Sequence, residues 1–127
     1  MNINQITILA TDVRACIDFY RALGLRMIVD SAPRYVRFEC PDGDSTLSIH
    51  QVDSDDEPAG GVVIYFECED LDEQVARLRA SGVEFEHGPE EMRWLWREAR
   101  LRDPAGNRIC LYRAGENRRH PPWRVGE

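Results

Sequence analysis

The side chains suited to acid–base chemistry are few, and they fall in stretches that we predict to be strands. Glu39, Glu67 and Tyr65 carry groups that can exchange a proton with a bound molecule. Glu39 shares a strand face with Arg37 and Tyr35. For Glu39 we therefore favour a cross-strand ion pair over a catalytic role.

A nucleophile is harder to assign. Cys110 needs a nearby base to lower the pKa of its thiol before it can attack a substrate. His50 is the candidate base, but no spacing in the sequence shows that the two residues meet. We therefore expect Cys110 to be a buried, inert thiol.

Two tryptophans suggest binding rather than catalysis. Trp94 and Trp96 are two residues apart, so they share one face of the strand that we predict there, with Arg93, Arg97 and Arg100 nearby. Each indole presents a large flat apolar area on which a planar ligand can stack. The alternative is that both rings close the core or a dimer interface, and the sequence leaves the two interpretations open.

The elements that must position these residues occur twice. Residues 5–12 and 63–70 are apolar runs that each end on an aspartate, and the two aspartates, Asp12 and Asp70, are 58 positions apart. A helical pattern follows each aspartate and ends at Gly24 or Gly82, again 58 positions apart. Asp12 and Asp70 are predicted N-caps, and Glu73 would complete a capping box with Asp70.

Each repeat reads as strand, helix and three strands, so we predict an α+β fold with a mixed sheet. The predicted strands of the first half are residues 3–10, 26–31, 35–40 and 46–52, and those of the second are 62–68, 83–86, 94–101 and 108–112. We expect one domain over residues 1–113, made of module one (1–53), an acidic linker (54–61) and module two (62–113). An arginine- and proline-rich tail (114–127) follows, in which Trp123 either docks on the protein or belongs to a disordered end.

Charge and composition narrow the class of protein. A net charge of −7 argues against nucleic acid as a partner and is compatible with a cationic ligand. No apolar run approaches the roughly 20 residues that cross a bilayer, and no signal-peptide pattern opens the chain, so we expect no membrane association and a cytoplasmic location. The four cysteines are scattered without CxxC spacing, as is typical of free thiols in a reducing compartment.

The pattern resembles the vicinal oxygen chelate superfamily, which includes glyoxalases, bleomycin resistance proteins and extradiol dioxygenases. The resemblance covers about residues 3–113 and rests on the paired modules, Thr11-Asp12 leading to the segment 19–25, the segment 70–72 that opens the second helix, and the turn 103–107. It implies two tandem βαβββ modules whose curled sheets form a cleft, in a protein that is commonly a homodimer. It also implies either a divalent metal that polarises substrate oxygens or, in some members, drug binding without metal.

The metal positions of the family are poorly filled here. Transferred one at a time, they fall on Gln5, Val63, Ser48 and Cys110. Gln5 offers an acceptable oxygen, Cys110 suits zinc but not magnesium or manganese, and the other two are poor ligands. We therefore expect no metal at these positions.

A displaced site is the alternative. Because strand residues two apart share a face, His50 and Glu67 can replace Ser48 and Val63, so that a zinc, iron, nickel or manganese ion would be held by Gln5, His50, Glu67 and Cys110. The simpler interpretation places His50 at a strand end near the surface and makes Glu67 a solvated or arginine-paired carboxylate.

Three hypotheses follow for the function. In the first, the protein binds a small organic molecule in a cleft between the modules that is lined by Gln5, His50, Tyr65, Glu67, Trp94, Trp96 and Cys110. In the second, it is a metal-dependent lyase, isomerase or dioxygenase that uses the displaced donors. In the third, it is a dimeric scaffold without a ligand. Whether the protein is an enzyme stays open, and no catalytic residue is assigned.

Overall fold

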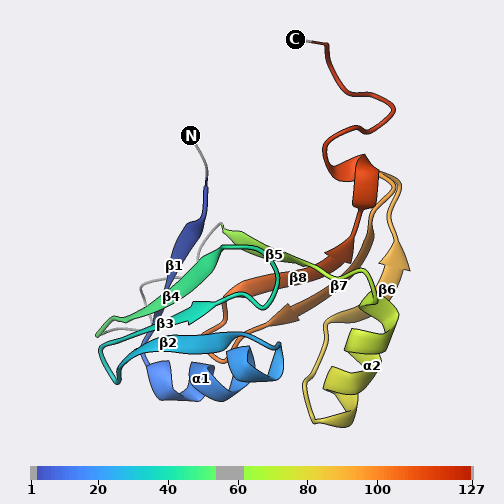
Figure 1. The fold of residues 1–127 in the computed structure, drawn as a ribbon. Coiled ribbons are helices and arrows are strands. Elements are labelled where there is room, and N and C mark those ends of the chain that lie inside the picture. The colour runs from blue at the N-terminus through green and yellow to red at the C-terminus, as the bar shows by residue number, and fades with distance from the viewer. Residues whose placement is uncertain (1–2, 54–61, 127) are drawn as a thin grey trace. The chain divides into compact units, whose positions relative to one another are not determined.

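The chain folds as two copies of one βαβββ module. A computed structural model describes residues 3–53 and 62–126, and Figure 1 shows the two copies. The first module consists of β1 (Gln5–Ala10), α1 (Val13–Ala22), β2 (Arg26–Ser31), β3 (Tyr35–Glu39) and β4 (Thr46–Gln51). The second consists of β5 (Val63–Glu67), α2 (Leu71–Ala80), β6 (His87–Glu91), β7 (Arg97–Arg102) and β8 (Arg108–Arg113), and a short 3-10 helix, η1 (Gly115–Arg118), follows it. The predicted fold class is confirmed, while the predicted linker, residues 54–61, lies outside the described residues.

Each module forms an open four-stranded sheet with the same topology. The strand orders are β1-β4-β3-β2 and β5-β8-β7-β6. The first strand of each module pairs in parallel with the last, and the other pairs are antiparallel. Because the last strand lies between the first and the third, side chains from three strands meet on one face of each sheet.

The helices begin and end largely as the sequence predicts. The Asp12 carboxylate accepts a hydrogen bond from the Ala15 amide at 3.1 Å and caps α1. Gly24 and Gly82 both have a left-handed backbone, with φ of +99° and +97°, which explains why a glycine follows each helix. Neither helix has the length and apolar character of a membrane span within the part of the chain that the structure describes.

The predicted capping box at α2 is wrong. Asp70 occupies the N-cap position, but its carboxylate makes no hydrogen bond to the backbone of the first turn. It accepts instead from the side-chain amide of Gln74, at 3.0 Å. The backbone carbonyl of Asp70 still accepts the first helical bond, from the Gln74 amide. A side-chain pair four residues apart has therefore replaced the expected cap.

Each sheet packs one face against the helix of its own module. We call the opposite face, whose side chains alternate with the helix-facing ones along each strand, the free face. In the first module Ile8, Phe38 and Ile49 are buried with Tyr20 of α1. In the second, Leu101 and Ile109 are among the buried residues, as are the α2 residues Leu71, Val75 and Leu78. The residues between the buried strand positions lie on the opposite faces, where the predicted site residues of the strands are found.

In the second module one predicted strand is not observed, and another begins later than predicted. Residues 83–86 are not a strand, because the Val83 amide still bonds to the carbonyl of Leu78 at the end of α2. The pairing strand β6 begins only at His87. The strand predicted at 94–101 begins at Arg97, since Met92 and Trp96 are joined by a backbone hydrogen bond of 2.8 Å that closes a turn. Leu95 in this turn has φ of +69°, so Trp94 and Trp96 lie in a turn and do not share a strand face.

The turn between β7 and β8 packs with the first module. Asp103–Asn107 belongs to the same compact unit as module one. The rest of module two and the tail form a second compact unit. The Tyr20 hydroxyl of α1 donates to the Asp103 carboxylate at 2.6 Å, and the side-chain amide of Asn107 donates to the backbone carbonyl of Leu9 at 3.2 Å. Burial and the Asp103 charge raise the pKa of Tyr20, so this phenol stays a donor.

The tail leaves the second sheet through η1 and extends beyond it (Figure 1). Trp123 is 57% exposed in the single chain, and its docking on this chain or on a partner stays a prediction. Local bonds organise the segment, since the Arg124 guanidinium lies 2.8 Å from the Arg119 carbonyl oxygen and 2.7 Å from His120 Nδ1.

Candidate functional site

The free face of the first sheet carries a polar network. β1, β3 and β4 lie side by side there, and the register places Arg37 directly opposite Ser48, and Gln5 opposite Thr46. Gln5 Nε2 donates to the Ser48 hydroxyl at 3.3 Å, and Gln5 Oε1 accepts from the Thr46 hydroxyl at 3.1 Å. Ser48 is fully buried, so its hydroxyl depends on these protein partners.

The network ends at a tyrosine. The Tyr35 and Ser48 hydroxyl oxygens lie 2.7 Å apart, and Arg37 Nε donates to the Tyr35 oxygen at 2.9 Å. The Arg37 guanidinium also lies 5.5 Å from the centroid of the Tyr35 ring. The hydrogen bond from Ser48, followed by the bond and charge of Arg37, lowers the pKa of Tyr35.

His50 lies on the same face but away from Gln5. It is exposed, and the register places it opposite Leu9 on β1 and Tyr35 on β3. Gln5 lies opposite Thr46, four residues earlier on β4. Four strand residues span about 13 Å. Gln5 and His50 of one chain are therefore too far apart to bind the same metal ion directly.

The free face of the second sheet carries a chain of polar contacts around one buried carboxylate. Glu98 is 1% exposed, and its carboxylate accepts from the Trp94 indole nitrogen at 2.7 Å. Its other oxygen accepts from Arg100 at 2.8 and 3.2 Å. Arg100 also donates to the Tyr65 hydroxyl at 3.2 Å. Glu98 therefore connects two aromatic side chains through hydrogen bonds that hold their polar ends in place.

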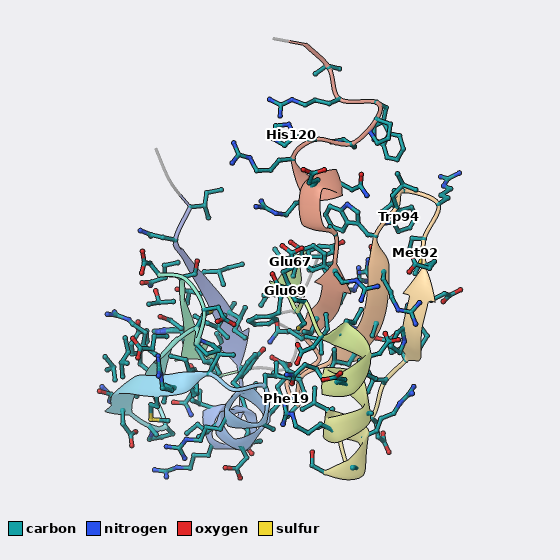
Figure 2. All side chains as sticks on the ribbon, turned by 45° about the vertical axis from the view of Figure 1, so that its right-hand side comes forward. Phe19, Glu67, Glu69, Met92, Trp94 and His120 are labelled. Atoms are coloured by element: carbon teal, nitrogen blue, oxygen red, sulfur yellow. The ribbon has the colours of Figure 1, made fainter. Side chains whose placement is uncertain are left out.

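The rings themselves form a cluster. Trp96 stacks on Tyr112 with ring centroids 4.7 Å apart, and Tyr65 meets both rings edge-on at 5.9 and 5.5 Å. Tyr65 remains 44% exposed and Trp94 39% exposed, whereas Tyr112 is buried. Figure 2 shows Trp94 near Met92 in the turn that follows β6. The predicted aromatic residues thus all belong to the second unit, although Trp94 and Trp96 lie in the turn before β7 and not on a strand.

Cys110 lies beneath this cluster as an inert thiol. It is fully buried and packs with Val63, Trp96 and Tyr112. Burial, and then the charge of Glu98, raise the pKa of Cys110 to about 12. A thiol with such a pKa is not a nucleophile near neutral pH.

Glu67 has a structural task. One carboxylate oxygen accepts from the backbone amides of Ala114 and Gly115, each at 3.0 Å, and the other lies 3.7 Å from Arg118. It thereby fixes the start of η1 against the end of β5. Figure 2 shows Glu67 close to this end of the strand. A metal ion would have to displace these bonds.

The donor set does not fit a family-type metal. Gln5 is bonded to Ser48, Val63 has no donor atom, Cys110 is a buried neutral thiol, and Glu67 holds the tail. No cluster of three His, Cys, Asp or Glu side chains suited to a metal occurs among residues 3–53 and 62–126. The prediction that both modules share one cleft remains a prediction.

Sequence reasoning missed Glu98, and it assigned Tyr35 and Arg37 only to an ion pair. Glu39 does form a cross-strand ion pair, but with Arg26, at 3.2 Å. The available signal was a shared spacing: Tyr35 precedes Arg37 by two residues, as Glu98 precedes Arg100. Residues two apart on a strand point to one face, so either pair can be recognised as neighbours.

A shallow depression of about 290 Å³ lies elsewhere on the second unit. Its lining includes Arg97, Arg113, Glu91 and Leu95, and none of the predicted site residues belongs to it. Arg97 is already held there by Asp72 through two bonds of 2.7 and 2.9 Å. The hydrogen bond from Arg97 also lowers the pKa of Asp72. We therefore assign no function to this depression.

Comparisons with known proteins identify the family. The family model described as "Glyoxalase/Bleomycin resistance protein/Dioxygenase superfamily" matches residues 2–111, and the chain therefore belongs to this superfamily. None of the curated proteins searched matches the sequence.

Solved structures share the fold. A glyoxalase/bleomycin resistance protein/dioxygenase from Nocardioides is 24% identical with a TM-score of 0.77, covering 99% of this chain and 90% of its own. Lactoylglutathione lyase from Agrobacterium tumefaciens is 24% identical with a TM-score of 0.73, covering 88% and 92%. A bleomycin-binding protein in complex with bleomycin is 19% identical with a TM-score of 0.70, covering 89% and 98%. At these identities the likeness establishes the fold and not the activity.

Proposed function

We propose that this superfamily member binds a planar organic molecule against the exposed rings of Tyr65 and Trp94. The observation that carries the proposal is the contrast between the two ends of these side chains. Their rings are 44% and 39% exposed, while their polar ends belong to the hydrogen-bonded chain through the buried Glu98.

The physical argument is preorganisation. An exposed aromatic ring held in one position loses little conformational entropy when a ligand stacks on it. Tyr65 and Trp94 are held through Arg100 and Glu98, which gives the surface a defined shape before the ligand arrives. The net charge of −7 favours a cationic ligand over an anionic one at long range. A protein of the same fold is complexed with bleomycin, so this architecture can accommodate an organic drug.

The test is tryptophan fluorescence quenching by a planar cationic acridine dye, with bleomycin as a second probe. Trp94→Leu and Tyr65→Leu should each weaken dye binding about tenfold, which corresponds to about 1.4 kcal/mol. Trp123→Leu is the matched control, since Trp123 is an exposed indole in the tail, and it should leave the affinity unchanged. Saturable quenching that survives Trp94→Leu and is lost in Trp123→Leu would contradict the proposal.

A catalytic role through metal has no such support, because Gln5 and Glu67 are engaged in other bonds and Cys110 is a buried thiol. The predicted homodimer stays part of the proposal and is tested by light scattering, with an expected mass of twice the 14.6 kDa chain. Metal analysis of protein purified without chelators tests the alternative enzyme. A stoichiometric metal that is lost in His50→Ala would favour the displaced site and a lyase, isomerase or dioxygenase.

A further inference from the structure

The polar network of the first unit has a direction. Thr46 donates to Gln5, and Gln5 donates to Ser48. The Ser48 hydroxyl has one proton, and giving it to Tyr35 satisfies both residues. Arg37 Nε also donates to the Tyr35 oxygen. In this arrangement two donors lie on the Tyr35 oxygen, and the phenol proton points away from the network.

The second feature is an uncompensated guanidinium. Arg37 spends its Nε–H on Tyr35, and among residues 3–53 and 62–126 no carboxylate forms an ion pair with it. The nearest carboxylate along its strand, Glu39, is paired with Arg26 on β2. The terminal N–H groups of Arg37 thus stay available beside the outward proton of Tyr35.

We propose that Tyr35 and Arg37 form a carboxylate-binding site on the free face of the first sheet. The phenol O–H and the terminal guanidinium N–H groups are donors on adjacent side chains, as a carboxylate with two acceptor oxygens requires. The buried Ser48 and the exposed Gln5 act as positioning residues, since Ser48 bonds to the Tyr35 oxygen and Gln5 bonds to Ser48. The site therefore takes a small organic acid.

The proposal does not depend on the function proposed for the aromatic rings, because all its residues belong to the first unit. Charge decides the ligand class. A cation would be repelled by Arg37, which pairs with no carboxylate of residues 3–53 and 62–126, whereas an anion forms charge-assisted hydrogen bonds with both donors.

The experiment compares benzoate with benzamide, which has the same shape but no negative charge. Benzoate titrated into the full chain at low ionic strength, and followed by calorimetry, should bind saturably, and benzamide should bind at least tenfold more weakly. Tyr35→Phe and Arg37→Gln should each lower benzoate affinity tenfold or more. Arg34→Gln, which removes the same charge from the exposed turn before β3, should have no effect.

A second readout needs no variant. A bound carboxylate accepts the Tyr35 proton in a hydrogen bond and repels the phenolate, so saturating benzoate should raise the pKa of Tyr35, as measured by absorbance near 295 nm in the alkaline range. Equal binding of benzamide, equal losses in Arg34→Gln and Arg37→Gln, or an absence of benzoate binding to the wild-type chain would each overturn the proposal. Trp94→Leu should leave benzoate binding unchanged, which separates this site from the aromatic one.

Discussion

Two arginines occupy equivalent positions in the two modules and meet different partners. Arg37 lies opposite Ser48 on β4, and Arg100 lies opposite Cys110 on β8. Each arginine uses its Nε–H on the residue two positions before it, which is Tyr35 in one module and Glu98 in the other. The backbone repeats, but the partner is a phenol in one case and a carboxylate in the other.

This difference in partners gives the free faces of the two sheets different binding properties. Glu98 neutralises Arg100, and the pair is buried on the carboxylate side, so this arginine works as a support for Tyr65 and Trp94. Tyr35 supplies no negative charge to Arg37, and no carboxylate in the described part of the chain pairs with this arginine. A buried carboxylate is tolerated only with partners, whereas a phenol needs no counter-ion. Module two therefore offers positioned rings, and module one offers positioned donors.

The turns that connect the last two strands differ as strongly. In module two the Asp103 carboxylate is buried and accepts from the Ala105 and Asn107 amides, the Asn107 side chain and the Tyr20 hydroxyl. In module one the corresponding turn, residues 41–44, is exposed. Only one of the two equivalent turns is thus tied to the body of the protein.

The largest effect is expected from Asp103→Ala. This change removes an acceptor with four hydrogen bonds and leaves the Tyr20 hydroxyl buried without its partner, so we expect a loss of about 4 kcal/mol of unfolding free energy. Asp42→Ala in the exposed turn is the control and should stay within about 0.5 kcal/mol of wild type. Both are measured by urea denaturation followed by circular dichroism. Equal effects at the two turns would remove this distinction between the modules.

The next effect tests the two arginine partners. Glu98→Ala removes the carboxylate that pairs with Arg100 and the acceptor of the Trp94 indole, and because Arg100 is 29% exposed we expect the lower end of the usual range, about 3 kcal/mol. Tyr35→Phe removes a hydroxyl at a more exposed site and should cost about 1 kcal/mol.

Glu90→Ala is the control for this pair of variants. Glu90 lies in the same sheet as Glu98, but its carboxylate is exposed and lies 3.6 Å from His87 Nδ1. Its loss should change the free energy of unfolding by about 0.5 kcal/mol or less. If Glu98→Ala is as mild as Glu90→Ala in urea denaturation, Glu98 is not the support that we infer.

The duplicated architecture was predictable because it depends on local signals. Apolar alternation, Asp12 and the glycines at the helix ends act within a few residues of the chain, and each of these features is observed as predicted. The combination of Tyr20 with the turn at Asp103 also carried the family resemblance. The structure supplies the reason, since these residues bond to each other across 83 positions of sequence.

The site was less predictable because its geometry depends on register and on a turn. Alternation suggested that Trp94 and Trp96 share a strand face. Instead both lie in a turn, which is closed by the hydrogen bond between Met92 and Trp96 and contains the left-handed Leu95. The burial of Glu98 depends on Trp94 and Arg100 reaching the same carboxylate, which no local pattern encodes. Cross-strand neighbours such as Arg37 and Ser48 are known only once the strands are paired.

The smallest effect tests the direction of the Tyr35 network. Ser48 is the main cause of the lowered pKa of Tyr35 and Arg37 a lesser one, so Ser48→Ala should raise that pKa more than Arg37→Gln does, both toward the ordinary value of a tyrosine. Absorbance near 295 nm follows the titration, and Tyr35→Phe identifies which transition belongs to this residue. If instead Arg37→Gln has the larger effect, Ser48 does not donate to the phenol, and the Tyr35 proton points back at Ser48.

The same titration has a consequence for stability. A phenol whose pKa is lower in the folded state stabilises the fold fully above the unfolded value of about 10, and this contribution is lost as the pH falls through the folded pKa. The stability difference between wild type and Tyr35→Phe should therefore grow as the pH rises through that range. Arg100 offers the contrast, since its partner is the carboxylate of Glu98 rather than a phenol. A growing difference for Tyr35→Phe, beside a constant one for Glu98→Ala, would show that only the module-one arginine is matched with a group that titrates in alkali.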